Sequence, residues 1–312
     1  MRPAASILLL TTLTGFAYGL LAWLGVYDAL GAAGAAERIL MLSGIGLAVV
    51  LATAGLAASA LHLGRRERAW RAFSQWRSSW LSREGVAALL TYPVALAFAA
   101  CALRSPSAPL TRLLGAAAAL SSLGTVYCTA MIYGSLKPIR QWHNPHTAPD
   151  YLIFALFSGG TLFVLLRTVV IGAAAWPAGL AGLAALAALL AKLAYWRYVD
   201  HQQPLATLAS AIGMAHGTEV RALDAPHFTE NFVLREMGFQ IARRHGAKLR
   251  RLALTVGFLL PLMLSLLGAS GGVPLVSSAL AVVCAALGLL TERWLFFAQA
   301  THVSALYYGR SI

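Results

Sequence analysis

Charged residues are scarce in this sequence. Asp, Glu, Lys and Arg together make up 11% of its 312 residues, only 11 residues are acidic, and 59% are hydrophobic. A soluble globule of this composition would leave most of its apolar surface in water, so the mean hydropathy of +0.71 favours a membrane protein. The formal net charge of +13 comes from basic residues between apolar segments, where membrane topology explains them better than phosphate binding. We therefore expect no nucleic-acid partner.

The sequence also lacks the patterns of nucleotide-driven enzymes and of metal sites. Neither GxxxxGK[ST] nor HExxH occurs in it, which leaves nucleotide-driven and zinc-hydrolase functions without support. Its cysteines, Cys101, Cys128 and Cys284, lie inside apolar segments without CxxC spacing or a neighbouring His. A haem would need histidines at matching depth, and only His62 with His302 offers a conceivable pair. We expect neither a metal nor a haem in this chain.

What the sequence has in abundance is long apolar segments. Eight of them are long enough to cross a hydrocarbon core of roughly 30 Å, and the first exceeds the apolar region of a signal peptide, so we expect it to be a retained anchor. The sequence predicts an all-α integral membrane protein with eight transmembrane helices in one bundle, forming a single domain over residues 1–312. The predicted spans are 5–27, 39–61, 86–103, 113–133, 151–174, 178–195, 252–270 and 274–297.

The basic residues lie mostly on one side of the predicted bundle. Eighteen of the 24 Lys and Arg residues fall at the termini or in the loops 62–85, 134–150 and 196–251. Cytoplasmic loops carry an excess of Lys and Arg, so these loops and both termini are predicted to be cytoplasmic. The same three loops and the end of the last span hold nearly all the residues suited to binding or proton transfer. We expect any ligand or partner to bind on this basic side.

The loop that follows the second span alternates arginines with large aromatic residues. Residues 61–84 read LHLGRRERAWRAFSQWRSSWLSRE, a mixture typical of a membrane–water interface because indole rings and long basic side chains are amphipathic. At about 100° per residue, Trp70, Phe73, Trp76 and Trp80 share one arc of an in-plane helix. Arg77 projects into that arc. The simpler interpretation is an aromatic belt that anchors the loop.

His62 and Glu84 stand at the two ends of this loop. A His near its usual pKa of about 6.5 can donate a hydrogen bond to a carbonyl, and a carboxylate at the membrane boundary can relay protons. The alternative is that His62 caps the second helix and that Glu84 pairs with Arg83 or another loop arginine. From the residues alone, both interpretations remain open.

Four further charged residues lie within the predicted spans. Arg167 and Lys192 lie near span ends, where we expect them to extend to the interface. Glu292 and Arg293 lie deeper and, being adjacent, are expected to point to different helix faces and to need separate partners. In the 196–251 loop, the segment HTENFVLREMGFQIARRHGAKLRR reads as an amphipathic helix, suited either to docking a soluble subunit or to capping the bundle with solvated charge.

Four blocks carry a family resemblance across essentially the whole chain. HLGRRERAWRAFSQWRSSWLSREG, YGSLKPIRQWHNPHTAPDYL, NFVLREMGFQIARRH and ERWLFFAQATHVSALYYGR together resemble the membrane-anchor subunits of the dimethyl sulfoxide reductase family. The resemblance implies a multi-pass anchor subunit in the bacterial inner membrane. It also implies partners that carry the molybdopterin and iron–sulfur clusters, an exchangeable quinone, and no haem.

The resemblance implies a quinone site and a docking face as well. The His and Glu that flank the second loop in the family match His62 and Glu84. The quinone and proton-relay set is expected to be His62, Glu84, Trp76, Trp80, Arg77, Arg140, His143 and Arg293. The arginines expected to dock the iron–sulfur and molybdopterin subunits are Arg65, Arg66, Arg68, Arg71, Arg235, Arg243 and Arg244.

The opening residues 2–22 look like the anchors of cytoplasmic sulfite dehydrogenases, a branch of this family. A basic, cytoplasmic docking face fits such a dehydrogenase, which would oxidise sulfite to sulfate and reduce quinone. The alternative is a menaquinol-oxidising anchor of a reductase for dimethyl sulfoxide or another S- or N-oxide. A stand-alone transporter is a third possibility, but such proteins typically show repeated halves with polar residues at mid-membrane depth, and the polar residues here cluster at one interface. A purely structural anchor without a quinone site is a fourth.

Overall fold

The computed structural model describes residues 3–31, 34–60, 66–214, 218–220 and 241–308. Within these ranges, only the backbone is described at residues 66, 241–244 and 307–308. Every regular element in the described ranges is helical, and eight helices there are long and apolar enough to cross a membrane. The predicted all-α class and the predicted eight long helices are confirmed.

Seven of the long helices are single α-helices, and the eighth is composite. The seven are α1 (Ala5–Ala29), α2 (Ala35–Ala60), α3 (Trp80–Arg104), α4 (Pro109–Gly134), α5 (Thr147–Val170), α6 (Ala175–His201) and α11 (Pro274–Ala298). The eighth runs through α9 (Ile241–Leu252), a π-helical segment η2 (Ala253–Leu259) and α10 (Leu260–Ala269).

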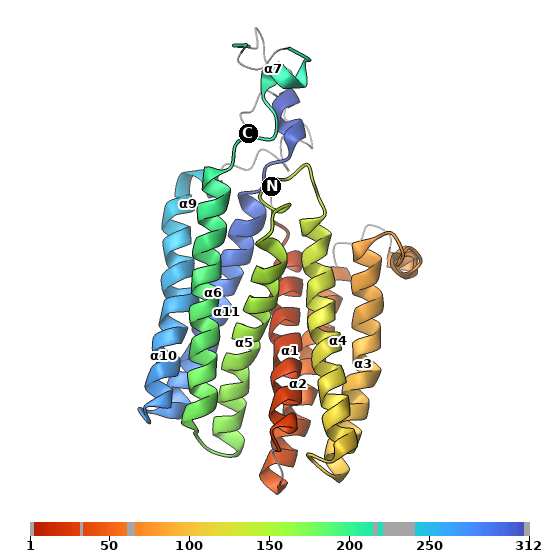
Figure 1. Ribbon diagram of the computed structural model, residues 1–312, viewed down its shortest axis with the longest axis vertical. Helices are drawn as coiled ribbons and strands as arrows, with labels where there is room; N and C mark the ends of the chain where they lie inside the picture. The colour runs from red at the N-terminus through yellow and green to blue at the C-terminus, as the bar shows by residue number, and fades with distance from the viewer. Residues whose placement is uncertain (1–2, 32–33, 61–65, 215–217, 221–240, 309–312) are drawn as a thin grey trace.

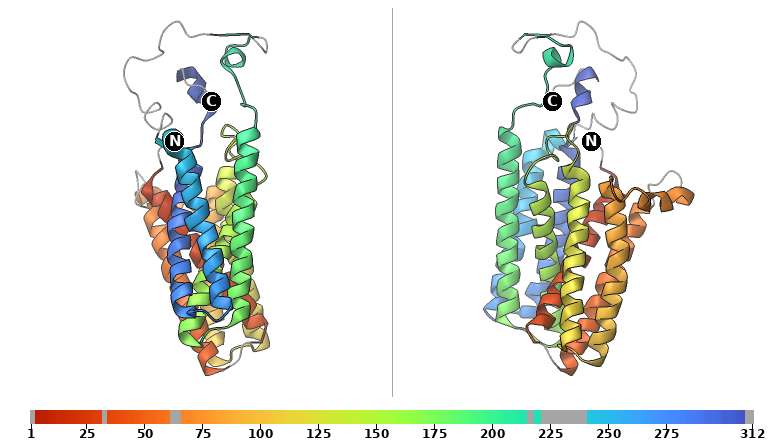
Figure 2. Two further views of the ribbon diagram at one scale, coloured as in Figure 1. Left: turned by 90° about the vertical axis from the view of Figure 1, so that its left-hand side faces the viewer. Right: turned by 45° about the vertical axis from the view of Figure 1, so that its right-hand side comes forward.

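The helices form one bundle around α1 and α5 (Figure 1). Helix α1 packs against α2, α4 and α5, while α5 also packs against α6 and α11. The first four helices and the last four therefore meet mainly along the α1–α5 contact. Both marked chain ends lie at the end of the bundle that carries α7 (Leu208–Ala211), as the views of Figure 2 also show. We call this the polar end.

Glycines bring helix backbones into direct contact at several places, and at two of them a Cβ atom would come within 1.8 Å of the facing backbone. A Cβ atom on Gly19 of α1 would lie 1.8 Å from the carbonyl oxygen of Ala155 in α5. A Cβ atom on Gly288 of α11 would lie 1.8 Å from Cα of Gly257, which is within η2. Because helices in lipid associate by close packing rather than by the hydrophobic effect, these positions require glycine. The second of these contacts lies within the π-helical segment η2, which packs directly against α11.

Several helices extend beyond the apolar segments that predicted them. Helix α3 begins at Trp80 rather than at residue 86, and α6 continues to His201 rather than ending at 195. The seventh membrane-capable helix starts at His245 rather than at 252. Hydropathy detects only the apolar part of a helix, whereas backbone hydrogen bonding continues into polar residues at its end. The second loop therefore ends before Trp80, and Glu84 lies within a helix.

Short segments connect the helices at the polar end. The 3₁₀ helix η1 (Arg66–Phe73) runs sideways from the upper end of α3, as the short orange helix in Figure 2 shows. The loop between α4 and α5 is held by α11, because the Trp142 indole donates to the Phe296 carbonyl oxygen at 2.9 Å. Past α11, Val303 N donates to the Pro138 carbonyl oxygen at 3.2 Å as η3 (Val303–Tyr308) begins. These contacts fix the loop over the ends of α4, α5 and α11.

Candidate functional site

Glu84 is a buried carboxylate in the first turns of α3. Its side chain accepts a hydrogen bond of 2.6 Å from the Thr129 hydroxyl of α4, and the residue is only 7% exposed. One helical turn nearer the opposite end of α4, the Thr125 hydroxyl lies 3.2 Å from that of Thr91. Two polar contacts therefore join α3 and α4, and one of them is made by the Glu84 carboxylate.

Arg83, the neighbour of Glu84, binds elsewhere. It donates to the backbone carbonyl oxygens of Trp76 at 3.0 Å and Arg77 at 2.7 Å, and its guanidinium carbon lies 4.3 Å from the centroid of a Trp80 ring. The alternative in which Arg83 pairs with Glu84 is therefore wrong in this structure. Arg83 instead binds the turn that precedes α3 and holds it close to the first residues of this helix.

The aromatic residues of the second loop do not lie on one helix, so that prediction is wrong. Phe73 ends η1, Trp76 lies in the following turn, and Trp80 starts α3. The Phe73 ring packs over Gly85, where a Cβ atom would lie 2.9 Å from the ring. Trp80 packs edge-on against Tyr127 of α4, with ring centroids 5.8 Å apart. Phe73 and Trp80 thus flank the helical turn that carries Glu84, whereas Trp76 and Arg77 are exposed.

A second group of charges is buried between α5, α6 and α11. The Lys192 ammonium lies 2.5 Å from a Glu292 oxygen and 4.0 Å from a carboxylate oxygen of Asp150. Nε of Arg293 lies 3.4 Å from the other Glu292 oxygen. All four side chains are at most 6% exposed. Lys192, Glu292, Arg293 and Asp150 thus form what we call the charged layer, with two cations and two anions.

Aromatic rings complete the surroundings of the two cations. The Lys192 ammonium lies 3.7 Å from the ring centroid of Tyr195, and the Arg293 guanidinium carbon lies 3.7 Å from that of Tyr151. The prediction that Lys192 extends to the interface is wrong, because α6 continues past it and its ammonium binds Glu292. Glu292 and Arg293 do have separate partners, as predicted, but they also contact each other.

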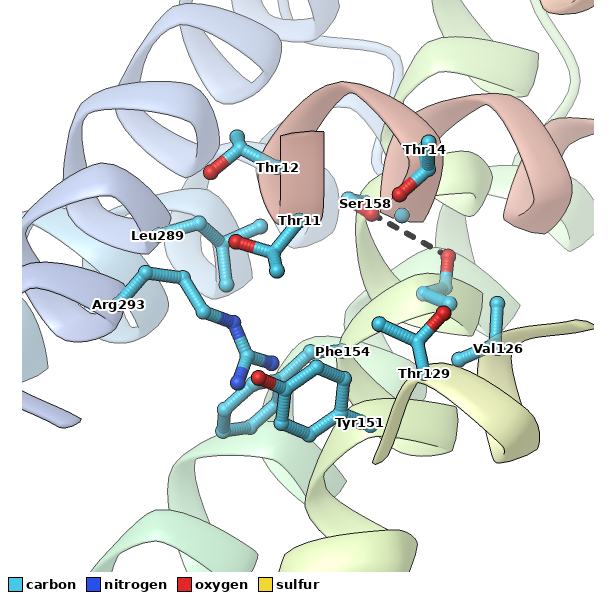
Figure 3. Close-up of a pocket in the computed structure, with 12 residues that line it drawn as sticks. Thr11, Thr12, Thr14, Val126, Thr129, Tyr151, Phe154, Ser158, Leu289 and Arg293 are labelled. Atoms are coloured by element: carbon cyan, nitrogen blue, oxygen red, sulfur yellow. Dashed lines mark hydrogen bonds between the residues drawn. The ribbon is translucent and has the colours of Figure 1, made fainter. Parts of the chain in front are cut away.

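A small cavity links Glu84 to the charged layer (Figure 3). It lies between α1, α4, α5 and α11 and has a volume of about 20 Å³, enough for one water molecule. Thr129, which binds Glu84, and Arg293 of the charged layer both line it. Figure 3 shows the Arg293 guanidinium beside the Tyr151 ring, with Thr129 across the cavity. The other hydroxyl groups in the lining belong to Thr11, Thr12, Thr14 and Ser158.

The remaining residues of the predicted quinone set lie apart from this cavity. Arg140 donates to the Gln202 carbonyl oxygen at 2.5 Å and lines a wider pocket of about 590 Å³ at the ends of α6 and α9. Nδ1 of His143 lies 2.6 Å from the Gly134 carbonyl oxygen, and the side chain is exposed. The structure thus places Arg293 in the lining of the cavity and Glu84 next to that lining, bonded to Thr129, and it gives Arg140 and His143 other surroundings. His62 lies outside the described residues.

Two of the predicted docking arginines are visible as exposed side chains. Arg68 and Arg71 lie on η1, and the Arg71 guanidinium carbon lies 5.7 Å from the centroid of a Trp70 ring. Arg65 and Arg235 lie outside the described residues. For Arg66, Arg243 and Arg244, only the backbone is described.

Sequence reasoning missed four residues that build this site: Thr129, Asp150, Tyr151 and Lys192. A signal was present for Lys192, because an ionisable residue inside an apolar segment is a functional candidate by default. Asp150 was assigned to a loop because it stands next to the start of the apolar segment. Thr129 and Tyr151 carry no such signal, since single hydroxyl groups are common within membrane helices.

Comparison with known proteins assigns this architecture to a family. The model of the family described as "DMSO reductase anchor subunit (DmsC)" matches residues 2–308. The chain is also 31% identical, over 99% of its own length and 99% of the relative's, to a sulfite dehydrogenase subunit of Allochromatium vinosum.

Proposed function

The chain belongs to the DMSO reductase anchor subunit family, and from this membership we propose that it carries electrons between an iron–sulfur partner and the quinone pool. As an anchor subunit it holds a molybdopterin catalytic subunit and an iron–sulfur subunit on the membrane. The substrate of the catalytic subunit does not reach this chain. The chain itself provides the place where quinone and the electron-carrying partner approach each other.

The observation that carries the quinone proposal is the environment of Glu84. Reduction of a quinone takes up two electrons and two protons, so a quinone site needs a group that gives protons to the carbonyl oxygens. Glu84 is an ionisable residue inside a membrane helix, where such residues are costly and usually functional. It lies among aromatic residues that suit a quinone ring, with Phe73 and Trp80 flanking its helical turn. His62, at the other end of the loop, is the proposed second proton donor.

The polar end is the proposed docking face. Arg68 and Arg71 are exposed there on η1. Exposed arginines suit bidentate contacts with carboxylates of a soluble partner. By the excess of basic residues in its loops, this end faces the cytoplasm, and the membrane is the bacterial inner membrane.

The proposed reaction of the complex is the oxidation of sulfite. Sulfite and one water molecule give sulfate, two protons and two electrons at the catalytic subunit, and the electrons reduce quinone at the anchor. The similarity to the sulfite dehydrogenase subunit of Allochromatium vinosum and a cytoplasmic docking face support this direction. The alternative direction, menaquinol oxidation for a reductase of S- or N-oxides, uses the same residues with protons leaving Glu84.

Purification of the tagged chain from its native membranes tests the anchor proposal. The chain is expected to bring down molybdenum and iron in fixed ratios to itself, because its partners contain the molybdopterin and the clusters. A chain with Arg68→Glu and Arg71→Glu is expected to lose most of both metals, while Arg104→Glu, on the opposite end of α3, retains them. Purification of the wild-type chain alone and without metals, with transport activity, would favour a transporter instead.

A further inference from the structure

The charged layer and the cavity lie at a similar depth and connect Glu84 to the opposite side of the bundle. Thr129 stands five residues before the end of α4, Tyr151 four residues after the start of α5, and Arg293 five residues before the end of α11. At 1.5 Å per residue, each is roughly 6–8 Å inside the polar end. The groups thus form a layer that runs across the bundle rather than along it.

The cavity has the properties of a water site. Its lining contains hydroxyl groups from three helices, and its volume of about 20 Å³ suits one molecule of water. Among the described residues, the buried Thr12 hydroxyl in this lining has no hydrogen-bond partner. Because buried polar groups are nearly always bonded to protein or to water, this hydroxyl indicates that the cavity is wet.

Tyr151 connects the two carboxylates on either side of the cavity. Its ring centroid lies 3.7 Å from the guanidinium carbon of Arg293, and Nε of Arg293 lies 3.4 Å from a Glu292 oxygen. Tyr151 lines the cavity together with Thr129, whose hydroxyl donates to Glu84. A phenol can accept a proton and donate one in the same step. With one water molecule in the cavity, Tyr151 and Thr129 span the distance from the charged layer to Glu84.

The other end of the charged layer reaches the wider pocket. Tyr195 and Trp196 line that pocket, and the Lys192 ammonium lies 3.7 Å from the first ring and 5.1 Å from the second. The pocket has a volume of about 590 Å³ and is bordered by charged residues of α6 and α9, among them Asp200 and Arg250. The two rings therefore lie between Lys192 and a pocket at the polar end.

We propose that these groups form a proton route from the wider pocket through Lys192, Glu292, Tyr151 and the cavity to Glu84. The proposal rests on the proposed function, in which Glu84 protonates the quinone. In each transfer a donor gives one proton to the next group and regains one from the group behind it. The two electrons come from the iron–sulfur partner, two protons come from water at the polar end, and one quinone becomes one quinol.

The route gives the charged layer a function that offsets its cost. Burying four charges is costly, and apolar side chains of similar volume would often stabilise a protein better. Glu292 in particular has one oxygen near Lys192 and the other near Arg293. This carboxylate can therefore take a proton from one side and release it on the other without moving its backbone.

The rate of quinone-linked oxidation of the iron–sulfur clusters tests the route. The purified complex is reduced with dithionite, and the excess dithionite is removed. The reduced complex is then mixed with a short-chain benzoquinone, and the oxidation of its clusters is followed by absorbance in H₂O and in D₂O. Tyr151→Phe is expected to slow the reaction at least about tenfold, because a positioned proton donor contributes on the order of 10²–10⁴, and to raise the solvent isotope effect. Glu292→Gln is expected to act in the same way.

Matched controls separate the route from a structural role. Oxidation of the clusters by ferricyanide, which needs no protons, should match the wild type in each variant. Tyr198→Phe also removes a phenol hydroxyl at the polar end, but its ring lies against His146, outside the cavity, so its quinone-linked rate should not change. If Glu84→Gln slows the reaction while Tyr151→Phe and Glu292→Gln leave both rate and isotope effect unchanged, the route is refuted and the quinone proposal stands. If Glu84→Gln also changes nothing, the quinone proposal itself fails.

Discussion

Replacing Glu84 by Gln is expected to slow the oxidation of the reduced iron–sulfur clusters by quinone about a hundredfold or more. In the wild type, the Thr129 hydroxyl donates to Glu84 at 2.6 Å. Gln keeps the size of the side chain and an oxygen that can accept this hydrogen bond, but it cannot deliver a proton. The assembled complex should therefore retain its clusters and their oxidation by ferricyanide. The measurement is the ratio of the quinone-linked rate to the ferricyanide-linked rate in the purified complex.

Glu67→Gln is the matched control for this variant. Glu67 is also a carboxylate of the second loop region, but it is exposed on η1, where water can replace any interaction that it makes. Its rate ratio should equal that of the wild type. An unchanged ratio in Glu84→Gln would show that this carboxylate takes no part in quinone chemistry and would favour a purely structural anchor.

Replacing Lys192 by Met is expected to cause the largest loss of stability. Glu292 would remain buried without its closest cation, and removing one partner of a buried ion pair typically costs about 3–5 kcal/mol. The double variant with Glu292→Met leaves Asp150 and Arg293 as one anion and one cation, so it should recover most of the loss. The unfolding free energy in detergent is measured for the wild type, for Lys192→Met, for Glu292→Met and for the double variant. These four values give the coupling energy between Lys192 and Glu292.

The ion pair between Arg250 and Asp200 provides the comparison. Nη1 of Arg250 lies 2.6 Å from an Asp200 oxygen, but the side chains are 24% and 50% exposed. An exposed pair contributes about 0–1 kcal/mol, so Arg250→Met should cost little. A loss in Lys192→Met no larger than in Arg250→Met would mean that the charged layer is not electrostatically coupled as its geometry indicates.

The sequence alone predicted the parts of this molecule that depend on local composition. Eight apolar segments correspond to eight long helices because a helix in lipid must satisfy its own backbone hydrogen bonds. Glu84 and Arg293 were identified because charges in or beside apolar segments are rare. The gathering of polar residues at one end of the bundle also follows from their positions in the chain.

The sequence did not show how side chains from distant helices meet. Lys192 was expected at the interface because its apolar segment ends soon after it, yet Glu292, 100 residues further along the chain, holds its ammonium inside the bundle. The charged layer exists only when α5, α6 and α11 pack together. In the same way, Thr129 gains its role from α3, which lies beside α4 and carries Glu84.

The aromatic loop shows a second limit. A projection at about 100° per residue assumes one continuous α-helix, but residues 66–80 contain a 3₁₀ helix, a turn and the start of α3. The Arg83 side chain fixes that turn by binding two backbone carbonyl oxygens. Such a side-chain contact leaves no periodic pattern in the sequence.

The proposed function requires that the polar end, with Glu84, the charged layer and the proposed docking arginines, faces the cytoplasm. Two fusions at the carboxyl terminus measure this orientation directly. One carries a fluorescent protein that matures only in the cytoplasm, and the other carries an alkaline phosphatase that is active only outside it. We predict a fluorescent first fusion and an inactive second fusion, both present in the membrane in equal amounts. An active phosphatase with a dark fluorescent fusion would place the polar end outside and contradict the account.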